Sequence, residues 1–303
     1  PAACPPPASA SARAPTLRVR SMLPAVRAWD DATRDAAPAA RQAAFRRMVV
    51  DAHPDVFGPV FAVPDSAGLA RYLEWLTPRL PAAYRVAAHL ERELPPAAAR
   101  MAALLPPLAG AEVPVVLGLT LGRTNGTVRL VDGRPVLFLG VEVQTILSDR
   151  ADDAAATAEH ELTHVAHARA NPALYARVDA GVRGVPTPLY VSLFAEGLAA
   201  WAVGCATPGR TAAQRLMSAD LPTAAPAAAA RLLPELAADL ESTDPKRYAD
   251  WFFVGGRRAD VPARFAYWAG ERVVARMAGR RTAEALLRLD AETVLREVRE
   301  GLR

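Results

Sequence analysis

The segment HELTH at residues 160–164 contains two histidines four residues apart with a glutamate between them. On an α-helix, residues i and i+4 project from the same face, so the imidazoles of His160 and His164 can converge on one metal ion. Glu161 then lies beside the open position of the metal, where it can act as a general base. The sequence therefore predicts His160 and His164 as ligands of one zinc ion and Glu161 as the catalytic base.

His167 extends the same helical face, so three of the 5 histidines in the chain fall within eight residues. A lone histidine on a helix is most often simply buried, but three on one face make that interpretation less attractive. His167 lies a further turn along the helix axis, which is too far for it to share a metal with His160 and His164. We expect it to contact a metal ligand or the substrate.

A catalytic zinc ion needs a third protein ligand and an open position for water. The extended pattern HExxHxxGxxH does not fit, because His167 stands where glycine is required and Pro172 follows soon after. Glu196, in contrast, is the sole acidic residue of the apolar helix expected over residues 188–204. A carboxylate buried there needs a compensating cation or metal. We therefore expect Glu196 to be the third ligand, with Gly197 allowing the two helices to approach closely; the alternative is an exposed glutamate on an amphipathic helix.

The zinc helix is expected to run from residue 148 or 149 to residue 170, and the three apolar, β-branched runs before it have the character of strands. These runs are residues 113–121, 127–131 and 135–143, separated by Asn-Gly and Asp-Gly turn pairs. The pattern predicts three antiparallel strands. The free edge of residues 135–143 could hold an extended peptide by β-augmentation.

Helical patterns dominate the rest of the chain. Residues 17–110 and the chain from residue 211 onward are rich in Ala, Leu and Arg, and the first of these segments is broken by Pro54, Pro64, Pro78, Pro81, Pro95 and Pro96. The fold class expected is α+β, with a small, mostly antiparallel sheet and an active-site helix flanked by helical N- and C-terminal lobes. Residues 1–18 are expected to be a disordered Pro/Ala/Ser tether, and residues 19–303 a single domain made of a helical lobe (19–110), the sheet (111–145), the zinc-site helices (146–206) and a second helical lobe (207–303).

Charge and hydropathy argue against a nucleic-acid partner and against a membrane-spanning segment. The net charge is +4, but the arginines are isolated doublets between acidic residues, so we expect no nucleic-acid partner. The most apolar stretches, residues 113–121 and 191–203, are shorter than the roughly 20 residues that cross a bilayer, which predicts no transmembrane segment.

The N-terminus bears on location. Ala2-Ala3-Cys4 is compatible with the end of a bacterial lipoprotein signal, which favours export and makes Cys4 a candidate lipid anchor, although Pro1 replaces the usual Leu. An arbitrary start of the chain and a cytoplasmic location are left open. Cys205 lies in an apolar segment, so we expect a buried, inert thiol and no disulfide framework.

HELTH followed by AEGLAAWA resembles the gluzincin branch of zinc metallopeptidases, and more narrowly a family of bacterial proteins described as predicted zinc-dependent proteases. Residues 28–57, 138–142 and 267–274 are also similar to that family. The resemblance implies a zincin-like fold, ligands at His160, His164 and Glu196, and the base at Glu161. Many gluzincins carry an Asp four residues after the ligand Glu, whereas this chain has Ala200.

These patterns predict hydrolysis of a peptide bond in a peptide or protein substrate, with specificity left open. A donor is needed for the tetrahedral oxyanion. Tyr267 is favoured by its place in the YWAG segment, and the alternatives are Tyr248, Tyr190, Arg264 and Arg272. Two other classes compete with a peptidase. One is a zinc protein with a non-peptidase hydrolase activity or a catalytically degenerate binding or scaffold role; the other is a metal-free helical interaction protein.

Overall fold

The computed structural model describes residue 4 and residues 13–148, 150–253 and 258–303. The fold is α+β, with a small mixed sheet among many helices, which confirms the coarse fold class. The chain groups into two compact units. We call Leu17–Pro95 with Val113–Ala158 the sheet unit, and Pro1–Thr16 with Pro96–Glu112 and Glu159–Arg303 the helical unit. These interleaved segments do not coincide with the consecutive lobes expected from the sequence.

The sheet has four strands in the order β1-β2-β4-β3: β1 (Thr16–Ser21), β2 (Glu112–Gly118), β3 (Gly126–Val131) and β4 (Arg134–Gly140). β3 and β4 are antiparallel and joined by a two-residue turn in which Asp132 and Gly133 both have positive φ, as the Asp-Gly pair predicts. β2 and β4, however, are parallel, so the prediction of three antiparallel strands is wrong. β4 lies inside the sheet, which also contradicts the free peptide-binding edge expected at residues 135–143.

Two further expectations for these segments are wrong. β1 begins at Thr16, within the range expected to be a tether and at the start of the range expected to be helical, because the alternating segment TLRVRS pairs along the sheet and the backbone N–H of Met22 donates to Leu117. The strand expected to reach residue 143 ends at Gly140, and a helix begins at once, α5 (Val141–Leu147). Of the expected tether, residues 1–3 and 5–12 lie outside the described residues.

Besides α5 and the first part of α6 (Ala151–Ala170), the helices of the sheet unit are α1 (Leu23–Thr33), α2 (Pro38–Phe45), α3 (Ser66–Leu76) and the first part of α4 (Leu80–Leu104). Pro95 and Pro96 were expected to break the chain here, but both lie inside α4, which continues through them. Each proline removes one backbone donor, and the alanine-rich turns on the C-terminal side favour continuation of the helix. Pro81, in contrast, stands in the first turn of α4, where proline is tolerated.

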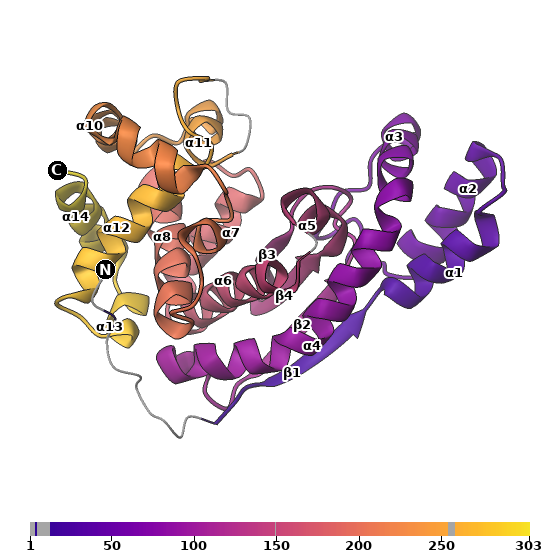
Figure 1. The fold of residues 1–303 in the computed structure, drawn as a ribbon, viewed down its shortest axis with the longest axis horizontal. Coiled ribbons are helices and arrows are strands. Elements are labelled where there is room, and N and C mark those ends of the chain that lie inside the picture. Colours follow the sequence, from indigo (N-terminus) through magenta and orange to yellow (C-terminus); the bar gives the residue numbers. More distant parts are fainter. Residues whose placement is uncertain (1–3, 5–12, 149, 254–257) are drawn as a thin grey trace. The chain divides into compact units, whose positions relative to one another are not determined.

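The helical unit is built around two long helices, the second part of α6 (Ala151–Ala170) and α8 (Leu189–Ala206) (Figure 1). Its other helices are α7 (Pro172–Val182), α9 (Ala212–Arg215), α10 (Leu221–Asp239), α11 (Pro245–Phe252), α12 (Phe265–Ala278), α13 (Ala283–Leu287) and α14 (Ala291–Gly301). By length and composition alone α8 could cross a membrane, but 78% of it is buried inside the protein. We interpret it as the core helix of this unit.

α8 and α12 cross at two glycines, Gly197 and Gly270, and a Cβ atom added to either would lie within 2.6 Å of backbone atoms of the other helix. From the sequence, Gly197 was expected to allow a close approach between the zinc helix and the apolar helix. The structure corrects the partner, because the helix that Gly197 admits is α12. This crossing brings Tyr267, one turn before Gly270, toward the residues on α8.

Cys4 and Cys205 form a disulfide bond between the N-terminal segment and the last turn of α8. This corrects the expectation of an inert thiol at Cys205, which failed because residues far apart in sequence meet in the helical unit. A sulfur in this bond carries no lipid, so the disulfide and a lipid anchor at Cys4 are alternative states of the same atom.

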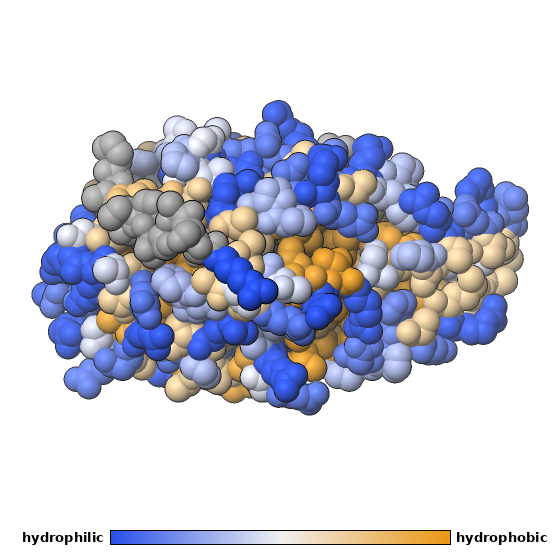
Figure 2. Space-filling view, turned by 90° about the horizontal axis from the view of Figure 1, so that it is seen from below, coloured by the Kyte–Doolittle hydropathy of each residue, from blue (hydrophilic) through white to orange (hydrophobic). Residues whose placement is uncertain are grey.

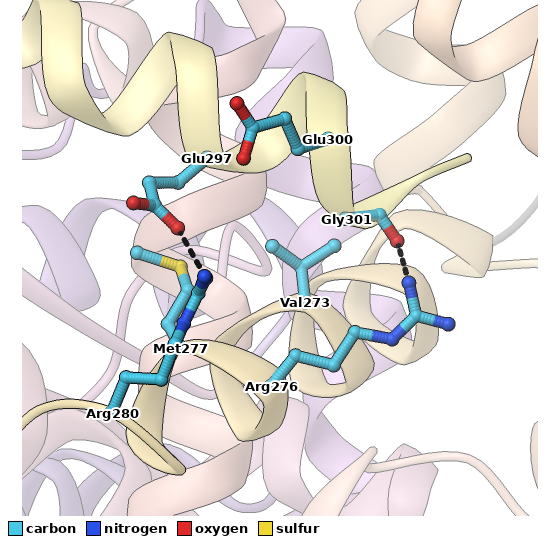
Figure 3. A pocket seen from close by; sticks show the side chains of 7 residues that line it. All are labelled: Val273, Arg276, Met277, Arg280, Glu297, Glu300 and Gly301. Atoms are coloured by element: carbon cyan, nitrogen blue, oxygen red, sulfur yellow. Dashed lines mark hydrogen bonds and ion pairs between the residues drawn. The ribbon is translucent and has the colours of Figure 1, made fainter.

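The surface carries hydrophilic residues throughout the face shown in Figure 2, with apolar residues exposed between them. A cavity of about 310 Å³ lies between α12 and α14 (Figure 3). Arg280 pairs with Glu297 on its wall, and Arg276 donates to the Gly301 carbonyl. None of the predicted zinc-site residues lines this cavity.

Candidate metal centre

His160 and His164 lie on α6, which has acidic residues in its first turn and ends before Asn171, as predicted. Both imidazoles are almost completely buried, with 1% and 5% of the residue exposed. Their Nε2 atoms are 3.2 Å apart, so the two rings converge on one point beside the helix. The i, i+4 spacing therefore produces the convergence that the sequence predicted.

Glu196 of α8 points at the same place. Its Oε2 atom lies 3.0 Å from Nε2 of His160 and 3.6 Å from Nε2 of His164. A tetrahedral metal ion with ligand bonds of about 2.0–2.1 Å holds its ligand atoms about 3.3 Å apart, and the three separations bracket that value. Only 14% of the Glu196 side chain is exposed, which excludes the alternative of a glutamate facing solvent. His160, His164 and Glu196 thus form a donor set that fits one metal ion.

Electrostatic coupling within this triad is strong. Burial raises the pKa of Glu196, but the two imidazoles outweigh burial and hold that pKa well below its usual range. Burial lowers the pKa of His160, although Glu196 opposes it. For His164 the carboxylates of Glu196 and Glu161 outweigh burial, and the pKa is raised. An anionic carboxylate beside two imidazoles is the charge arrangement that a divalent cation requires.

Glu161 lies next to the triad without being part of it. Together with the two histidines it forms a group whose ligand atoms lie within 4.8 Å of one another, and this group could itself hold a metal ion. Glu196, however, contacts both imidazoles directly, whereas Oε2 of Glu161 is buried without a hydrogen-bond partner in the described part of the chain. Burial raises the pKa of Glu161 to about 7. A carboxylate with that pKa can both accept and release a proton near neutral pH.

Tyr267, on α12, stacks on His160 with ring centroids 6.0 Å apart and an interplanar angle of 21°. Burial and the Glu196 carboxylate raise the pKa of its phenol well above the usual value, so the hydroxyl stays protonated as a donor. The alternatives differ in their contacts. Tyr248 is hydrogen-bonded to Ser192. Tyr190 accepts from Arg177, and Arg272 lies over the Trp268 ring.

His167 is completely buried and does not join the ligand atoms. Its ring meets Tyr175 and Phe194 edge to face, with centroids 5.6 and 5.8 Å away, and neither ring nitrogen has a hydrogen-bond partner within the described part of the chain. Burial lowers its pKa to about 3, which keeps the imidazole neutral. His167 therefore belongs to the aromatic core behind the triad, which the sequence did not predict.

Within the described residues, no carboxylate contacts the second ring nitrogen of His160 or His164. Position 200 is a fully buried alanine, and the Nδ1 atoms of His160 and His164 are buried with no hydrogen-bond partner among residues 13–148, 150–253 and 258–303. Metal-binding histidines usually donate their second ring N–H to such a partner, which fixes the ring orientation. Here the rings are held by packing, through the stacked Tyr267 and through Tyr175.

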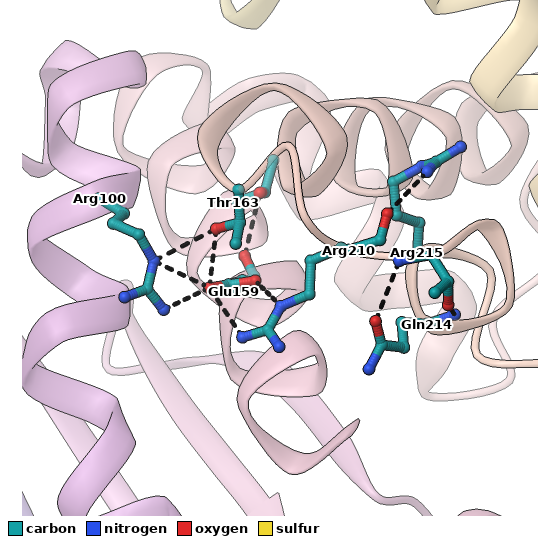
Figure 4. Close-up of polar contacts among 8 residues, drawn as sticks. Arg100, Glu159, Thr163, Arg210, Gln214 and Arg215 are labelled. Atoms are coloured by element: carbon teal, nitrogen blue, oxygen red, sulfur yellow. Dashed lines mark hydrogen bonds and ion pairs between the residues drawn. The ribbon is translucent and has the colours of Figure 1, made fainter. Parts of the chain in front are cut away.

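Glu159, one residue before His160, is a positioning residue that the sequence analysis missed. Its fully buried carboxylate accepts from Arg100 at 2.6 Å, from Arg210 at 3.0 Å and from the Thr207 hydroxyl at 3.0 Å (Figure 4). These contacts connect α6 to α4 and to the segment after α8. The position of Glu159, in an alanine-rich helix beside the HELTH motif, could have indicated a buried ion pair. Its partners Arg100 and Arg210 could not be predicted, because they are distant in sequence.

Comparison with known protein families, with characterised proteins and with solved structures finds no match to this chain.

Proposed function

We propose that this protein is a zinc-dependent peptidase, with His160, His164 and Glu196 as ligands of one zinc ion and Glu161 as general base. The observation that carries the proposal is the triangle of ligand atoms, with sides of 3.0, 3.2 and 3.6 Å, beside an unpartnered glutamate oxygen. Two histidines and one carboxylate form a donor set used by catalytic zinc sites, which keep a fourth position open for water.

A bound zinc ion supplies a Lewis acid that lowers the pKa of its water to about 7 and polarises the scissile carbonyl. Glu161 would act as the general base: its Oε2, unpartnered among the described residues, would accept a proton from the attacking water and deliver it to the amine nitrogen as the C–N bond breaks, because its pKa of about 7 suits both transfers. Tyr267, a protonated phenol stacked on His160, donates to the oxyanion that develops on the carbonyl.

Several broader expectations stand with this proposal. The gluzincin resemblance of HELTH and AEGLAAWA supports a zincin-like fold and a peptide or protein substrate. The isolated arginine doublets, interleaved with acidic residues, favour the absence of a nucleic-acid partner. The Cys4–Cys205 disulfide favours an oxidising compartment and therefore export from a bacterial cell, as a periplasmic or secreted protein. A lipid anchor at Cys4 is the alternative state, which requires that this disulfide is absent.

The experiment combines metal analysis with a matched pair of enzymes. We expect the protein, purified without chelator, to hold about one zinc per chain. Wild type should cleave casein, and Glu161→Gln, which preserves side-chain shape, should lose that activity by at least about 100-fold while its zinc content is unchanged. Glu196→Gln, in contrast, should lower zinc content. Absence of zinc, or equal cleavage by wild type and Glu161→Gln, would sink the proposal.

A zinc protein that acts on non-peptide substrates, or that has lost catalysis and serves in binding, is the second candidate. It is favoured by the unpartnered Nδ1 atoms of both ligand histidines and by Ala200, since metal sites without this support bind and activate less well. This candidate predicts full zinc occupancy but no cleavage of casein. Screening the zinc-loaded protein on ester and amide substrates would then separate a hydrolase from a binding protein.

A further inference from the structure

Arg264 has an unusual backbone and unusual contacts. It is the residue before α12 and has a φ of +62°, which is uncommon for a residue other than glycine. Its Nη1 donates to the carbonyl of Met217 at 3.4 Å, and Met217 itself has a φ of +49°. The Arg264 guanidinium thus connects two residues whose backbones both have a left-handed conformation. Conformations of this kind cost free energy and gather where a side chain must be aimed at a ligand.

The guanidinium of Arg264 lies at the edge of the proposed metal centre. Its Cζ atom is 5.3 Å from the centroid of the Tyr267 ring, and that ring stacks on His160. Among the described residues, no carboxylate lies within ion-pair distance of it, whereas two other arginines of the helical unit have one: Arg210 contacts Glu159, and Arg215 contacts Glu271. Arg264 is partly buried, and its hydrogen bond to Met217 uses Nη1.

The charges of the site leave room for an anion. A divalent ion would be balanced by Glu161 and Glu196 when both are ionised. Arg264, which interacts electrostatically with Glu161, then adds one positive charge that has no ion pair among the described residues. The planar guanidinium matches a carboxylate through two parallel hydrogen bonds. Arg264 contacts Tyr267 rather than a ligand residue, so it lies one ring away from the metal centre. At this distance from the metal centre, the guanidinium group is better placed to bind a carboxylate on the residue next to the scissile bond than to bind the scissile carbonyl oxygen.

We propose that Arg264 binds a carboxylate of the substrate, on the residue that flanks the scissile bond. The inference rests on the proposed peptidase function and adds a substrate class to it. The carboxylate has two sources, a free peptide C-terminus or an acidic side chain. The first makes the protein a carboxypeptidase, and the second makes it an endopeptidase selective for acidic residues.

Binding to zinc-loaded Glu161→Gln protein tests this without turnover. The probes are four short peptides that share one sequence: a C-terminal acid and its amide, and an internal Asp and its Asn counterpart. We expect one member of one pair, the acid or the Asp peptide, to bind about 10- to 100-fold more tightly than its neutral partner. Adding Arg264→Gln should abolish this difference, and Arg264→Lys should retain part of it.

Arg276→Gln is the matched control, because Arg276 lies on the same helix and donates to the Gly301 carbonyl instead. It should leave the preference intact.

Equal binding of acid and neutral peptides by the parent protein would overturn the inference, as would a preference that survives Arg264→Gln. In active enzyme, Arg264→Gln should raise KM for the preferred peptide; an equal loss of kcat on all four peptides would place Arg264 at the oxyanion and refute the proposal. Failure of the peptidase function itself would appear separately, as absence of zinc or of Glu161-dependent cleavage.

Discussion

His167 and His164 lie one turn apart on α6, yet their surroundings move their pKa values in opposite directions. Glu196 and Glu161 outweigh burial at His164 and raise its pKa, whereas the rings of Tyr175 and Phe194 offer His167 no counter-charge, and burial lowers its pKa to about 3. One buried imidazole is therefore prepared for a cation or proton, and the other remains neutral in the core.

The depressed pKa of His167 predicts an acid-sensitive fold. Unfolded histidine titrates near pH 6.5, so between about pH 6.5 and 3 the unfolded chain binds a proton that the native protein excludes. Stability must therefore fall as pH falls, by about 2 kcal/mol from pH 6.5 to 5. Urea unfolding at pH 7.5 and 5.0 should show this loss in wild type and a smaller one in His167→Phe. An equal loss in both proteins would contradict the assignment.

The Glu159 carboxylate offers a second prediction at this scale. Glu159→Gln removes the buried negative charge that the Arg100 and Arg210 guanidinium groups contact, the Arg210 side chain being only 9% exposed, and we expect a loss of about 3–5 kcal/mol in unfolding free energy. The control is Glu284→Gln, whose i, i+4 pair with Arg288 is exposed and should cost no more than about 0.5 kcal/mol. Chemical denaturation measures both. Similar small losses would mean that the buried cluster does not hold α6 in place.

At the scale of helices, the crossing of α8 and α12 determines how Glu196 and Tyr267 meet. A methyl group at Gly270 would lie 2.4 Å from the Leu193 carbonyl oxygen, and backbone there cannot yield as a flexible side chain would. We expect Gly270→Ala to cost about 1–3 kcal/mol and to reduce cleavage by separating the two helices. Gly209→Ala is the control, since nothing lies within 4 Å of its Cβ. Thermal unfolding and a casein assay check both variants.

Local patterns in the sequence were sufficient for the elements that carry the candidate site. α6 and α8 lie close to their predicted ranges. Acidic residues and Asn171-Pro172 mark the ends of α6, and α8 is a nearly all-apolar run that begins after Pro188. The two-residue Asp-Gly turn likewise predicts the β3–β4 hairpin. The order of the strands could not be predicted from the sequence. Strands adjacent in sequence were expected to be neighbours in the sheet, but β2 pairs with β4, and β3 lies between these two strands only in the sequence. The same limit hid the partners of Glu159 and of Cys205.

At the scale of the whole chain, the two compact units are interleaved in sequence. α4 and α6 each contribute residues to both, and every proposed zinc ligand belongs to the helical unit. The net charge is +4, and several arginines of the helical unit are in ion pairs, with Glu159, Glu271 and Glu297. This pairing explains why a basic composition does not by itself indicate a nucleic-acid partner.

The Cys4–Cys205 bond closes a loop across 201 positions of the chain, so its main effect is on the unfolded state. Closing so long a loop removes conformational entropy from the unfolded chain, and we expect the bond to contribute about 2–4 kcal/mol. A reductant should therefore lower the midpoint of urea unfolding for wild type, while the double variant Cys4→Ser/Cys205→Ser should match reduced wild type and be insensitive to reductant. Mass spectrometry of protein from the native host decides between the two states of Cys4, because a lipidated Cys4 leaves Cys205 free to react with a thiol reagent. Oxidised wild type with the same midpoint as the double variant would mean that the bond contributes nothing to stability.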